Sequence, residues 1–359
     1  MREGWKYVSI LDVCKVYQPQ TIATSKLIEG AQYDVFGANG CIGKYNQYNH
    51  EEDEVLLTCR GATCGNINRS TPKSWINGNA MVVHPIGNDL IKDFLVYVLK
   101  SVDFSKVITG AAQPQITRTS LSSVTLSIPP LSEQERIVSL LDLEFAKIDA
   151  IKANAEKQLQ DAKDLFQSAL KDLLTPKEGW KIRKFGDVCE YYKEQGKWVN
   201  INYIGLENID AHTGKLIDYK SSNEVESSTF KFNKGDVLYG RLRPYLQKVI
   251  IAPFDGCCST EIFPIKSNVV NNVYLKFWLL SDAVTDIMNE SCSGCRMPRA
   301  NMNSFKEEYI QYPSEQEQII IANKLVDLQN MIGEIQFNYE QTITLCNDLK
   351  QSILKDIFG

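Results

Sequence analysis

The stretch that decides the fold is Leu131-Ser132-Glu133-Gln134-Glu135-Arg136-Ile137, because it returns later in the chain as Pro313-Ser314-Glu315-Gln316-Glu317-Gln318-Ile319. In each copy a serine is followed three residues later by a glutamate. A serine hydroxyl at this spacing accepts a backbone N–H of the first helical turn, while the carboxylate reaches back to the serine N–H. We therefore predict that Ser132 with Glu135, and Ser314 with Glu317, cap the starts of two long helices.

The repeat extends on both sides of these stretches. Upstream, Gly4-Trp5-Lys6 returns as Gly179-Trp180-Lys181. Downstream, Gln167-Ser168-Ala169-Leu170-Lys171-Asp172-Leu173 returns as Gln351-Ser352-Ile353-Leu354-Lys355-Asp356-Ile357. The offset grows from 182 residues at the serines to 184 at the helix ends, which predicts a first helix about two residues shorter than the second. The chain is expected to be two copies of one plan, a globular part followed by a helix.

Composition places the chain among soluble globular proteins. It has 359 residues, of which 43% are hydrophobic and 23% charged, so it suits two domains better than one core. We recognise no secretory leader and no apolar run long enough to span a membrane. Ten scattered cysteines fit a reducing compartment. These features predict a cytoplasmic protein with no membrane contact.

The net charge of −5 does not by itself indicate a nucleic-acid partner. The acidic excess lies in residues 131–178 and 314–359, whereas the globular parts are close to neutral. A phosphate-binding face would therefore depend on how side chains are arranged. Total charge neither supports nor excludes DNA.

Both expected helices carry a stripe of residues at alternating steps of three and four, the spacing of a coiled coil. In the second helix the stripe is Leu325, Leu328, Ile332, Ile335, Tyr339, Thr342, Cys346, Leu349 and Ile353. In the first it is Ile148, Ile151, Ala155, Gln158, Ala162, Leu165 and Ala169. We predict that the two helices pack on each other and run antiparallel, given domains at opposite ends. The alternative, in which each helix lies only on its own domain, remains open.

The globular parts are predicted to be mixed α+β structures. In the first, strands are expected at 54–61 and 80–85 and a helix at 89–104; in the second, strands at 235–241 and 248–253 and a helix at 273–288. The strand segments are rich in β-branched residues and are stopped by glycine or proline. The helical segments show apolar residues at helical spacing.

Several motifs together resemble the specificity subunit of type I restriction-modification enzymes. In the first copy they are Gly37-Ala38-Asn39-Gly40, Arg60-Gly61, Gln113-Pro114-Gln115-Ile116 and Pro129-Pro130-Leu131; in the second they are Gly235-Asp236-Val237-Leu238, Arg241-Leu242-Arg243-Pro244 and Met297-Pro298-Arg299-Ala300-Asn301. The resemblance covers essentially the whole chain. It implies an α+β fold with a pseudo-twofold internal repeat, in which target-recognition domains at 1–130 and 177–313 are joined by antiparallel coiled-coil helices at 131–176 and 314–359.

The resemblance also implies a division of labour between subunits. Each domain would read one half of a bipartite, asymmetric site on double-stranded DNA, while the helices would set the spacing and dock two methyltransferase subunits. S-adenosylmethionine would be bound by those subunits, and ATP and Mg by restriction subunits that carry a motor and a nuclease. No cofactor would be bound by this chain.

The residues themselves also predict a chain without catalytic function. We find no adenine-methylation motif, no phosphate-binding loop, and no triad context for His50, His84 or His212. The pair Cys292 and Cys295 has the spacing of zinc ligands, but no second pair completes a site, so no metal is expected.

Candidate DNA-reading residues follow from base chemistry, because arginine and lysine pair with guanine and asparagine and glutamine with adenine. The candidates in the first domain are Lys44, Arg60, Thr63, Asn66, Arg69, Gln113, Gln115, Thr117 and Arg118, with Lys44 and Arg69 suited to phosphates. The candidates in the second are Arg241, Arg243, Tyr245, Lys248, Arg296 and Arg299. In an extended segment Arg241 and Arg243 would face the same side. For each residue a solvated surface role stays open.

Three other functions are compatible with the sequence. One is a stand-alone enzyme, which an assay of the purified chain for methyl transfer or cleavage would detect. A coiled-coil adaptor that binds protein rather than DNA would show no salt-dependent duplex binding, whereas several phosphate contacts give a steep decline with salt. A specificity subunit of a modification-only defence complex would differ only in its partners.

Overall fold

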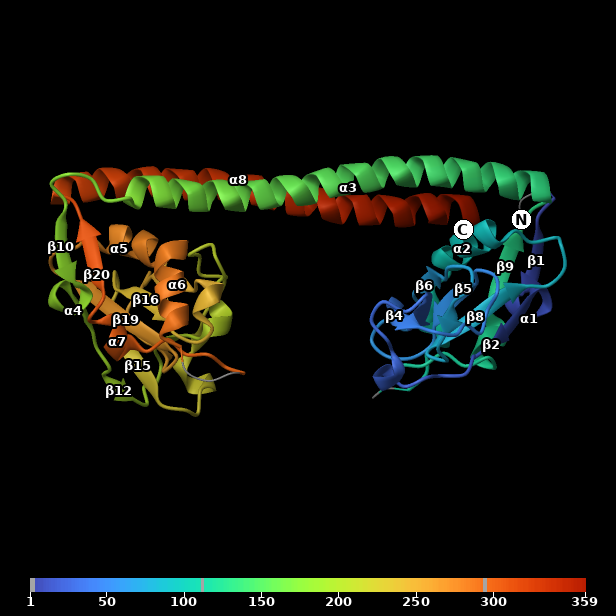
Figure 1. Ribbon diagram of the computed structural model, residues 1–359, viewed down its shortest axis with the longest axis horizontal. Coiled ribbons are helices and arrows are strands. Elements are labelled where there is room, and N and C mark those ends of the chain that lie inside the picture. The colour runs from blue at the N-terminus through green and yellow to red at the C-terminus, as the bar shows by residue number, and fades with distance from the viewer. Residues whose placement is uncertain (1–3, 111–112, 293–295) are drawn as a thin grey trace. The chain divides into compact units, whose positions relative to one another are not determined.

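The computed structural model describes residues 4–110, 113–292 and 296–359. The chain divides into two compact units, Met1–Asn154 with Thr342–Gly359 (unit 1) and Ala155–Gln341 (unit 2). Figure 1 labels the helices and strands of both units. Among the described residues, none of the helices combines the length and the apolar character needed to cross a lipid bilayer.

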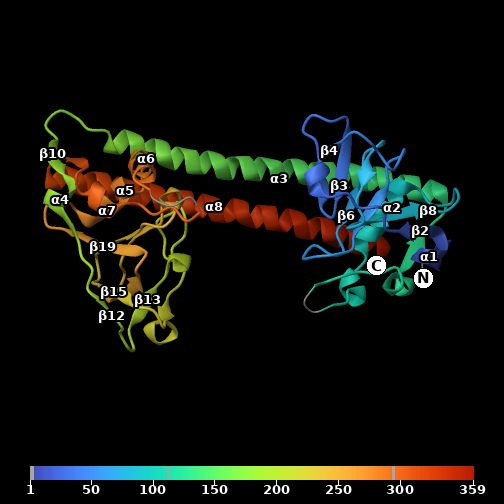
Figure 2. The same ribbon diagram turned by 60° about the horizontal axis from the view of Figure 1, so that its bottom comes forward.

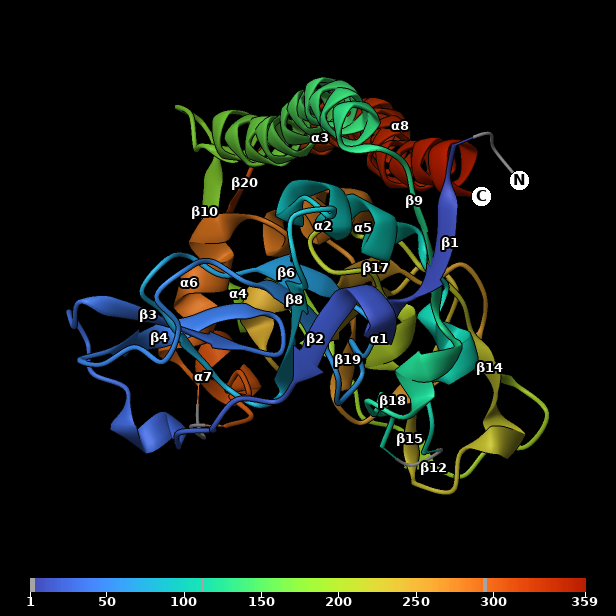
Figure 3. The same ribbon diagram turned by 90° about the vertical axis from the view of Figure 1, so that its right-hand side faces the viewer.

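The described residues of unit 1 form three antiparallel or mixed β-sheets. Strand β1 (Lys6–Ser9) pairs with β9 (Thr125–Ile128) beside the start of the long helix α3 (Leu131–Leu174) (Figures 1 and 3). After the short helix α1 (Ile10–Val13) comes the sheet β2-β8-β5-β6, formed by β2 (Cys14–Tyr17), β5 (Val55–Thr58), β6 (Ile67–Arg69) and β8 (Ala80–Pro85). The third sheet, β4-β3-β7, is formed by β3 (Tyr33–Gly37), β4 (Gly40–Tyr45) and β7 (Trp75–Ile76).

Strand β5 is buried along its whole length, and three of its four residues, Val55, Leu56 and Leu57, are apolar. Val55 and Leu57 pack in the cluster that contains Phe94 of α2 (Lys92–Ser101). Leu56, which points to the opposite face, packs against Phe36 from the β4-β3-β7 sheet. The sheet β2-β8-β5-β6 is therefore a middle layer, with α2 on one face and the smaller sheet on the other.

The two long helices run antiparallel within unit 1. Asp149 of α3 forms an ion pair with Lys350 of α8 (Glu315–Phe358) at 2.5 Å, and Lys152 of α3 donates to Asn347 of α8 at 3.1 Å. As the residue number rises on one helix it falls on the other, which confirms the antiparallel prediction. Helix α2 lies between these helices and the middle sheet (Figures 1 and 3).

Unit 2 repeats this plan. Strand β10 (Lys181–Lys184) pairs with β20 (Tyr309–Tyr312), and the short helix α4 (Phe185–Val188) leads into a four-stranded sheet. That sheet, β11-β19-β16-β17, consists of β11 (Cys189–Tyr191), β16 (Val237–Gly240), β17 (Val249–Ile251) and β19 (Ile262–Ser267). Helix α5 (Asn272–Leu279) covers one face, followed by α6 (Asp282–Glu290) and α7 (Met302–Phe305).

The four-stranded sheets of the two units have the same order and the same register. Val55 stands opposite Arg69 and Val83, as Val237 stands opposite Ile251 and Ile265. The second sheet of each unit differs, since unit 2 has five strands in the order β12-β15-β18-β13-β14. These are β12 (Gln195–Gly196), β13 (Asn202–Ile204), β14 (Lys220–Ser221), β15 (Thr229–Phe232) and β18 (Gly256–Ser259). Figures 1 and 2 show β12 and β15 on the side of unit 2 away from α8.

The two long helices do not both begin where the sequence repeat predicts. Both α3 and α8 have 44 residues, so the expectation of a shorter first helix is wrong. Helix α3 begins before Ser132, and the Pro130 carbonyl accepts the N–H groups of its first turn. Ser132 and Glu135 therefore lie inside the helix and do not form the predicted cap. Helix α8 begins after Ser314, whose hydroxyl accepts the Glu317 N–H at 3.4 Å.

A pair of buried glutamines, Gln134 and Gln318, explains why the two helix starts correspond at an offset of 184 residues and not at the offset of 182 between the serines. Gln134 is 0% exposed; its Nε2 donates to the carbonyls of Asp89 and Pro129, and its Oε1 accepts the N–H of Ile91, the N-cap residue of α2.

Gln318 occupies the same place in unit 2. Its Nε2 donates to the Pro313 carbonyl at 3.0 Å and its Oε1 accepts the N–H of Asn271, the N-cap residue of α5, at 2.7 Å. Each glutamine thus ties the first turn of a long helix to the start of the domain helix beneath it.

The predicted helix stripes are only partly buried. Ile148, Ala155, Ala162, Leu325, Ile332 and Cys346 are less than 8% exposed. Ile151, Leu165, Ile335 and Leu349 are between 41% and 56% exposed, so they do not belong to the buried seam. The buried positions recur mostly every seven residues. The buried seam is therefore narrower than the predicted stripe, in which residues recur at alternating steps of three and four.

The helix expected at 273–288 is two helices. The chain leaves the helical conformation at Ser281, which has an extended backbone and is the N-cap residue of α6. Its hydroxyl donates to the Trp278 carbonyl at 2.7 Å, closing the end of α5. Serine competes with the helix for backbone hydrogen bonds in this way, so apolar spacing alone did not reveal the break.

We predict that Gln318→Leu destabilises unit 2 by about 2–4 kcal/mol, because the Asn271 N–H and the Pro313 carbonyl lose their partner in a buried place. Urea unfolding followed by tryptophan fluorescence measures the loss. The matched control is Gln316→Leu, two residues away on the exposed side of α8, which should change stability by less than about 0.5 kcal/mol. Equal effects from the two substitutions would contradict a fastening role for Gln318.

Candidate nucleic-acid interface

In unit 1 two loops meet where β5 ends. Arg60 and Gln115 form an isolated β-bridge, and Gln115 forms a second one with Thr109. The Ile116 N–H donates to the Cys59 carbonyl at 3.0 Å, and the Gly61 N–H, at a φ of +91°, donates to the Pro114 carbonyl. The loop after β5 and the segment 113–118 are therefore one continuous surface.

A cleft of about 260 Å³ opens on this surface. Its lining includes four predicted DNA-reading residues, Arg60, Gln115, Thr117 and Arg118, all of which are exposed. It also includes Tyr17, the last residue of β2, and Gln18, which follows it; sequence reasoning missed both because no motif marks them. The Tyr17 hydroxyl and His50 Nε2 are 2.9 Å apart. Burial and the charge of Glu54 raise the pKa of Tyr17, so its hydroxyl stays neutral and can donate.

The remaining candidates of the first domain fall into two groups. Thr63 and Asn66 lie in the turn that follows Arg60, where the Asn66 N–H donates to the Thr63 carbonyl, and Gln113 is exposed beside Pro114. Lys44 and Arg69 lie on other elements, β4 and β6.

The positive charges of Lys44 and Arg69 are already balanced by carboxylates. Lys44 is 3.4 Å from Asp34, and Arg69 forms ion pairs with Asp53 at 2.6 Å and with Asp93. A phosphate would have to compete with these partners. The structure thus gives Arg69 a bridging contact to α2 that the sequence did not indicate.

In unit 2 the equivalent loops meet in the equivalent place. Leu242 and Arg299 form an isolated bridge, which matches the bridge between Arg60 and Gln115 in unit 1. Arg241, at the end of β16, donates from Nε to Glu261 Oε2 at 2.9 Å, and Arg299 donates from Nε to Glu261 Oε1 at 2.9 Å. The guanidinium of Arg241 also lies 5.2 Å from the centre of the Phe263 ring. Glu261 is the central residue of this cluster, and sequence reasoning missed it.

The expectation that Arg241 and Arg243 face the same side does not hold. Arg243 has a φ of +53°, so the segment is not extended and the alternation of sides is interrupted. Arg241 is half-buried, whereas Arg243 is exposed. Tyr245, in the 3₁₀ helix η6 (Pro244–Leu246), is 47% exposed and available to a ligand.

The other two basic candidates differ in availability. Lys248 donates to the Leu206 carbonyl at 2.6 Å and is therefore held by its own domain. Arg296 is exposed. The pair Cys292 and Cys295 lies partly outside the described residues, since 293–295 are not described. Within the part of the chain that is described, no group of three or more metal-ligating side chains occurs.

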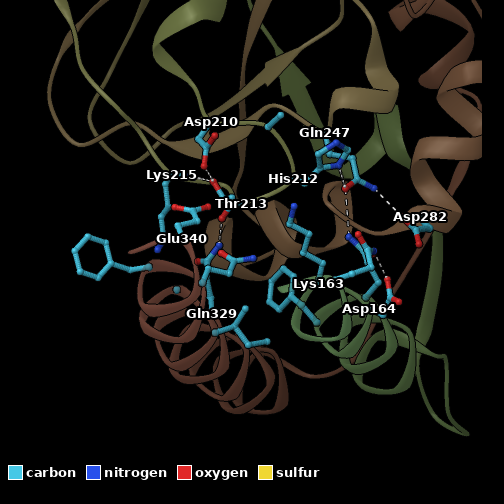
Figure 4. A pocket seen from close by; sticks show the side chains of 18 residues that line it. Lys163, Asp164, Asp210, His212, Thr213, Lys215, Gln247, Asp282, Gln329 and Glu340 are labelled. Atoms are coloured by element: carbon cyan, nitrogen blue, oxygen red, sulfur yellow. Dashed lines mark hydrogen bonds between the residues drawn. The ribbon is translucent and has the colours of Figure 1, made fainter. Parts of the chain in front are cut away.

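A larger cavity, of about 590 Å³, lies in unit 2 among α3, α8 and the loop around residues 210–215 (Figure 4). Gln329 of α8 donates to the Thr213 carbonyl and accepts from the buried Lys276 at 2.8 Å. On the other wall Gln247 donates to Asp282 at 2.8 Å, as Figure 4 shows. Lys163 extends from α3 into the same cavity (Figure 4). This cavity belongs to the helix side of the unit and not to the loops described above.

The chain has two domains of the same plan. Each presents polar side chains on loops at the end of its central sheet, as expected of a protein with two recognition domains. The family described as the type I restriction modification DNA specificity domain matches residues 2–161 and 177–355, and the chain belongs to this family.

Two relatives agree with this assignment. The EcoDI specificity subunit of Escherichia coli is 25% identical, over 99% of this chain and 88% of its own length. The MjaIX specificity subunit of Methanocaldococcus jannaschii is 22% identical, over 75% of this chain and 69% of its own.

A solved structure shares the fold. It is described as the structural basis underlying complex assembly and conformational transition of the type I R-M system, and one of its chains matches with a TM-score of 0.72 at 15% identity. The match covers 98% of this chain and 97% of that one. The likeness supports the two-domain α+β architecture over the whole length.

We predict that Gly333→Ala is neutral or stabilises the protein by up to about 1 kcal/mol. Gly333 lies inside α8, where alanine is the better helix former, and the added methyl would meet only the end of the flexible Lys215 side chain. Thermal unfolding measures the effect. A loss of more than about 1 kcal/mol would show that the contact of Lys215 with the helix is required.

We predict that Lys276 makes stability depend on pH. Burial, and after it the charge of Lys215, lowers the pKa of Lys276 to about 8 from 10.5. Between these values the unfolded chain binds more protons than the folded one, so this contribution to stability rises with pH. The variant Lys276→Met lacks this titrating group. The free energy of unfolding of the variant minus that of the parent should therefore fall by roughly 2–3 kcal/mol from pH 7 to pH 10. Urea unfolding across this range tests it, with the exposed Lys324→Met as the control that shows no such trend.

Proposed function

We propose that this chain is the DNA-specificity subunit of a type I restriction-modification complex, and that each of its domains reads one half of a bipartite site. The observation that carries the proposal is the repeated loop pair. In both units the loop after the central strand is bridged to the segment before the last strand, at Arg60 with Gln115 and at Leu242 with Arg299. Loops held by a rigid sheet are suited to recognition, and their side chains differ between the units.

The side chains on these loops have the chemistry of base and phosphate recognition. Arginine and glutamine, which dominate them, are the residues that address guanine and adenine edges. Each domain therefore needs its own base sequence, because Arg60 and Gln115 in one stand where Leu242 and Arg299 stand in the other. Family membership points to the same function.

The chain is proposed to recognise DNA without catalysing a reaction. Methyl transfer would be carried out by two methyltransferase subunits that bind S-adenosylmethionine, and cleavage by restriction subunits that use ATP and Mg. The long helices supply apolar surface for such protein partners. In unit 1 its exposed members are Leu131, Leu140, Leu143, Ile151, Leu345 and Leu349; in unit 2 they are Leu165, Ile319, Ile320, Met331, Ile335 and Phe337.

A modification-only complex would use the same surfaces without restriction subunits. An adaptor without DNA binding would leave the exposed arginines and glutamines of both loop pairs without a ligand. The adaptor is separated from the proposal by titrating a duplex at two salt concentrations, since phosphate contacts make DNA binding weaken steeply as salt rises. Binding that does not respond to salt would favour the adaptor.

We predict that Arg60→Ala relaxes one half of the recognised site. The full chain is assembled with its methyltransferase subunits, and methylated adenines are mapped by sequencing. Loss of a bidentate contact should weaken the preference at one base pair by about tenfold or more and leave the other half-site unchanged. The control is Lys106→Ala, whose side chain is exposed on the 3₁₀ helix η2 (Phe104–Val107). Uniform weakening at every sequence would instead identify Arg60 as a phosphate contact.

A further inference from the structure

Glu261 holds two arginines at the end of the central sheet of the second domain. Each carboxylate oxygen accepts one Nε–H, Oε2 from Arg241 and Oε1 from Arg299, both at 2.9 Å. The Glu261 side chain is 21% exposed, so this cluster lies at the surface of the domain while its charges are partly shielded from water.

The contacts fix the guanidinium of Arg241 and leave its outer edge unoccupied. The Nε–H is bound to Glu261, and the Phe263 ring lies 5.2 Å from the guanidinium carbon. The two terminal amino groups are the donors that a bidentate contact to guanine O6 and N7 requires. An arginine held at one edge and against a ring keeps this orientation before DNA arrives, so less side-chain freedom is lost on binding.

Arg299 has a different role in the cluster. One of its terminal amino groups donates to the Met297 carbonyl at 3.3 Å in addition to the Nε contact with Glu261. It therefore has fewer donors for a base than Arg241. The charge of Arg299 balances that of Glu261. Because Arg299 donates to Oε1 and Arg241 to Oε2, both carboxylate oxygens already have a donor within the protein, and neither is left to accept a hydrogen bond from cytosine.

The ion pairs are not required to hold the loops together. Three backbone hydrogen bonds already do so: the Arg241 N–H to the Glu261 carbonyl, the Ala300 N–H to the Arg241 carbonyl, and the Arg243 N–H to the Pro298 carbonyl. A carboxylate near DNA also repels phosphate. If the two arginines only bound the DNA backbone, Glu261 would weaken that binding. Its presence favours orientation of a base-reading arginine.

We propose that Glu261 is a positioning residue that determines specificity: it presents Arg241 as a reader of guanine, so the half-site of the second domain requires a G·C pair at the position that Arg241 contacts. This inference rests on the proposed function. It goes beyond it by naming one base of the target and the residue that controls the preference for it.

The first domain provides an internal comparison. Thr58 stands opposite Ala80 in the register of β5 and β8, as Gly240 stands opposite Ile262 in that of β16 and β19. Asn79 therefore stands where Glu261 stands. The first domain has no carboxylate at this place, so the effect of the cluster is confined to one half-site.

The test uses the full chain assembled with its methyltransferase subunits, and maps methylated adenines across a randomised DNA library by sequencing. The parent complex should show a strict guanine in one half-site. Glu261→Gln, which keeps the size of the side chain and removes its charge, should weaken that preference about tenfold and leave the other half-site unchanged. The matched control is Glu307→Gln, which removes a surface ion pair with Lys184 in the same unit and should leave both half-sites unchanged.

A second variant separates base reading from phosphate binding and from misfolding. Arg241→Lys keeps the positive charge but lacks the planar pair of donors, so it should relax the same position while the salt dependence of binding stays unchanged. The proposal is overturned if either variant lowers methylation equally at all sites, or if the parent complex accepts any base there. A parent complex that methylates no bipartite motif would overturn the proposed function first, before any variant is compared.

Discussion

The buried amide at the first turn of each long helix is the constraint on which the rest of each unit depends. Gln134 and Gln318 are almost fully buried, and their donors and acceptors are satisfied by backbone groups of the N-cap of α2 or α5 and of the proline before the helix. A buried amide left without hydrogen-bond partners would cost about 1–3 kcal/mol for each unsatisfied group. These bonds therefore hold the first turn of each long helix in a defined orientation on its own domain. Because α2 and α5 in turn cover the sheets whose ends carry the loops, the glutamines relate each helix to the recognition surface of its own unit.

Much of the regular structure could be predicted because it is encoded locally. Strand β8 was expected at residues 80–85, where the structure has it, since an apolar run stopped by a proline has few other solutions. The start of α3 could not be predicted in the same way. The Ser-x-x-Glu pattern around Ser132 is a local signal, but the buried contacts of Gln134 reach residues more than 40 positions earlier in the chain and override it. The break at Ser281 has the same origin, since apolar spacing does not record a hydroxyl that closes a helix.

The residues of the candidate interface likewise fall into those that the sequence predicted and those that it did not. Arg60, Gln115 and Arg118 were expected from motif position, and the structure places them around one cleft. Glu261 was not expected, because nothing near it in the sequence marks it, and its partners come from the end of β16 and from residue 299. The left-handed backbone of Arg243 was equally hidden, since non-glycine residues rarely adopt it and the sequence gives no cause. Contacts between distant strands, rather than residue types, decide which candidates can act together.

The loop that carries Arg241 ends at Gln247, and this end is tied to the helices of unit 2. Gln247 also has a positive φ, of 48°, and its side chain is held by Asp282 and Thr285 of α6 and by Gln167 of α3. A strained residue of this kind persists only where its surroundings fix it. The same loop therefore has its Arg241 end fixed by Glu261 and its Gln247 end fixed by α6 and α3. A movement of α3 within this unit would have to break the hydrogen bond between Gln167 and Gln247 or move the loop with it, so α3 and the segment 241–247 are mechanically linked.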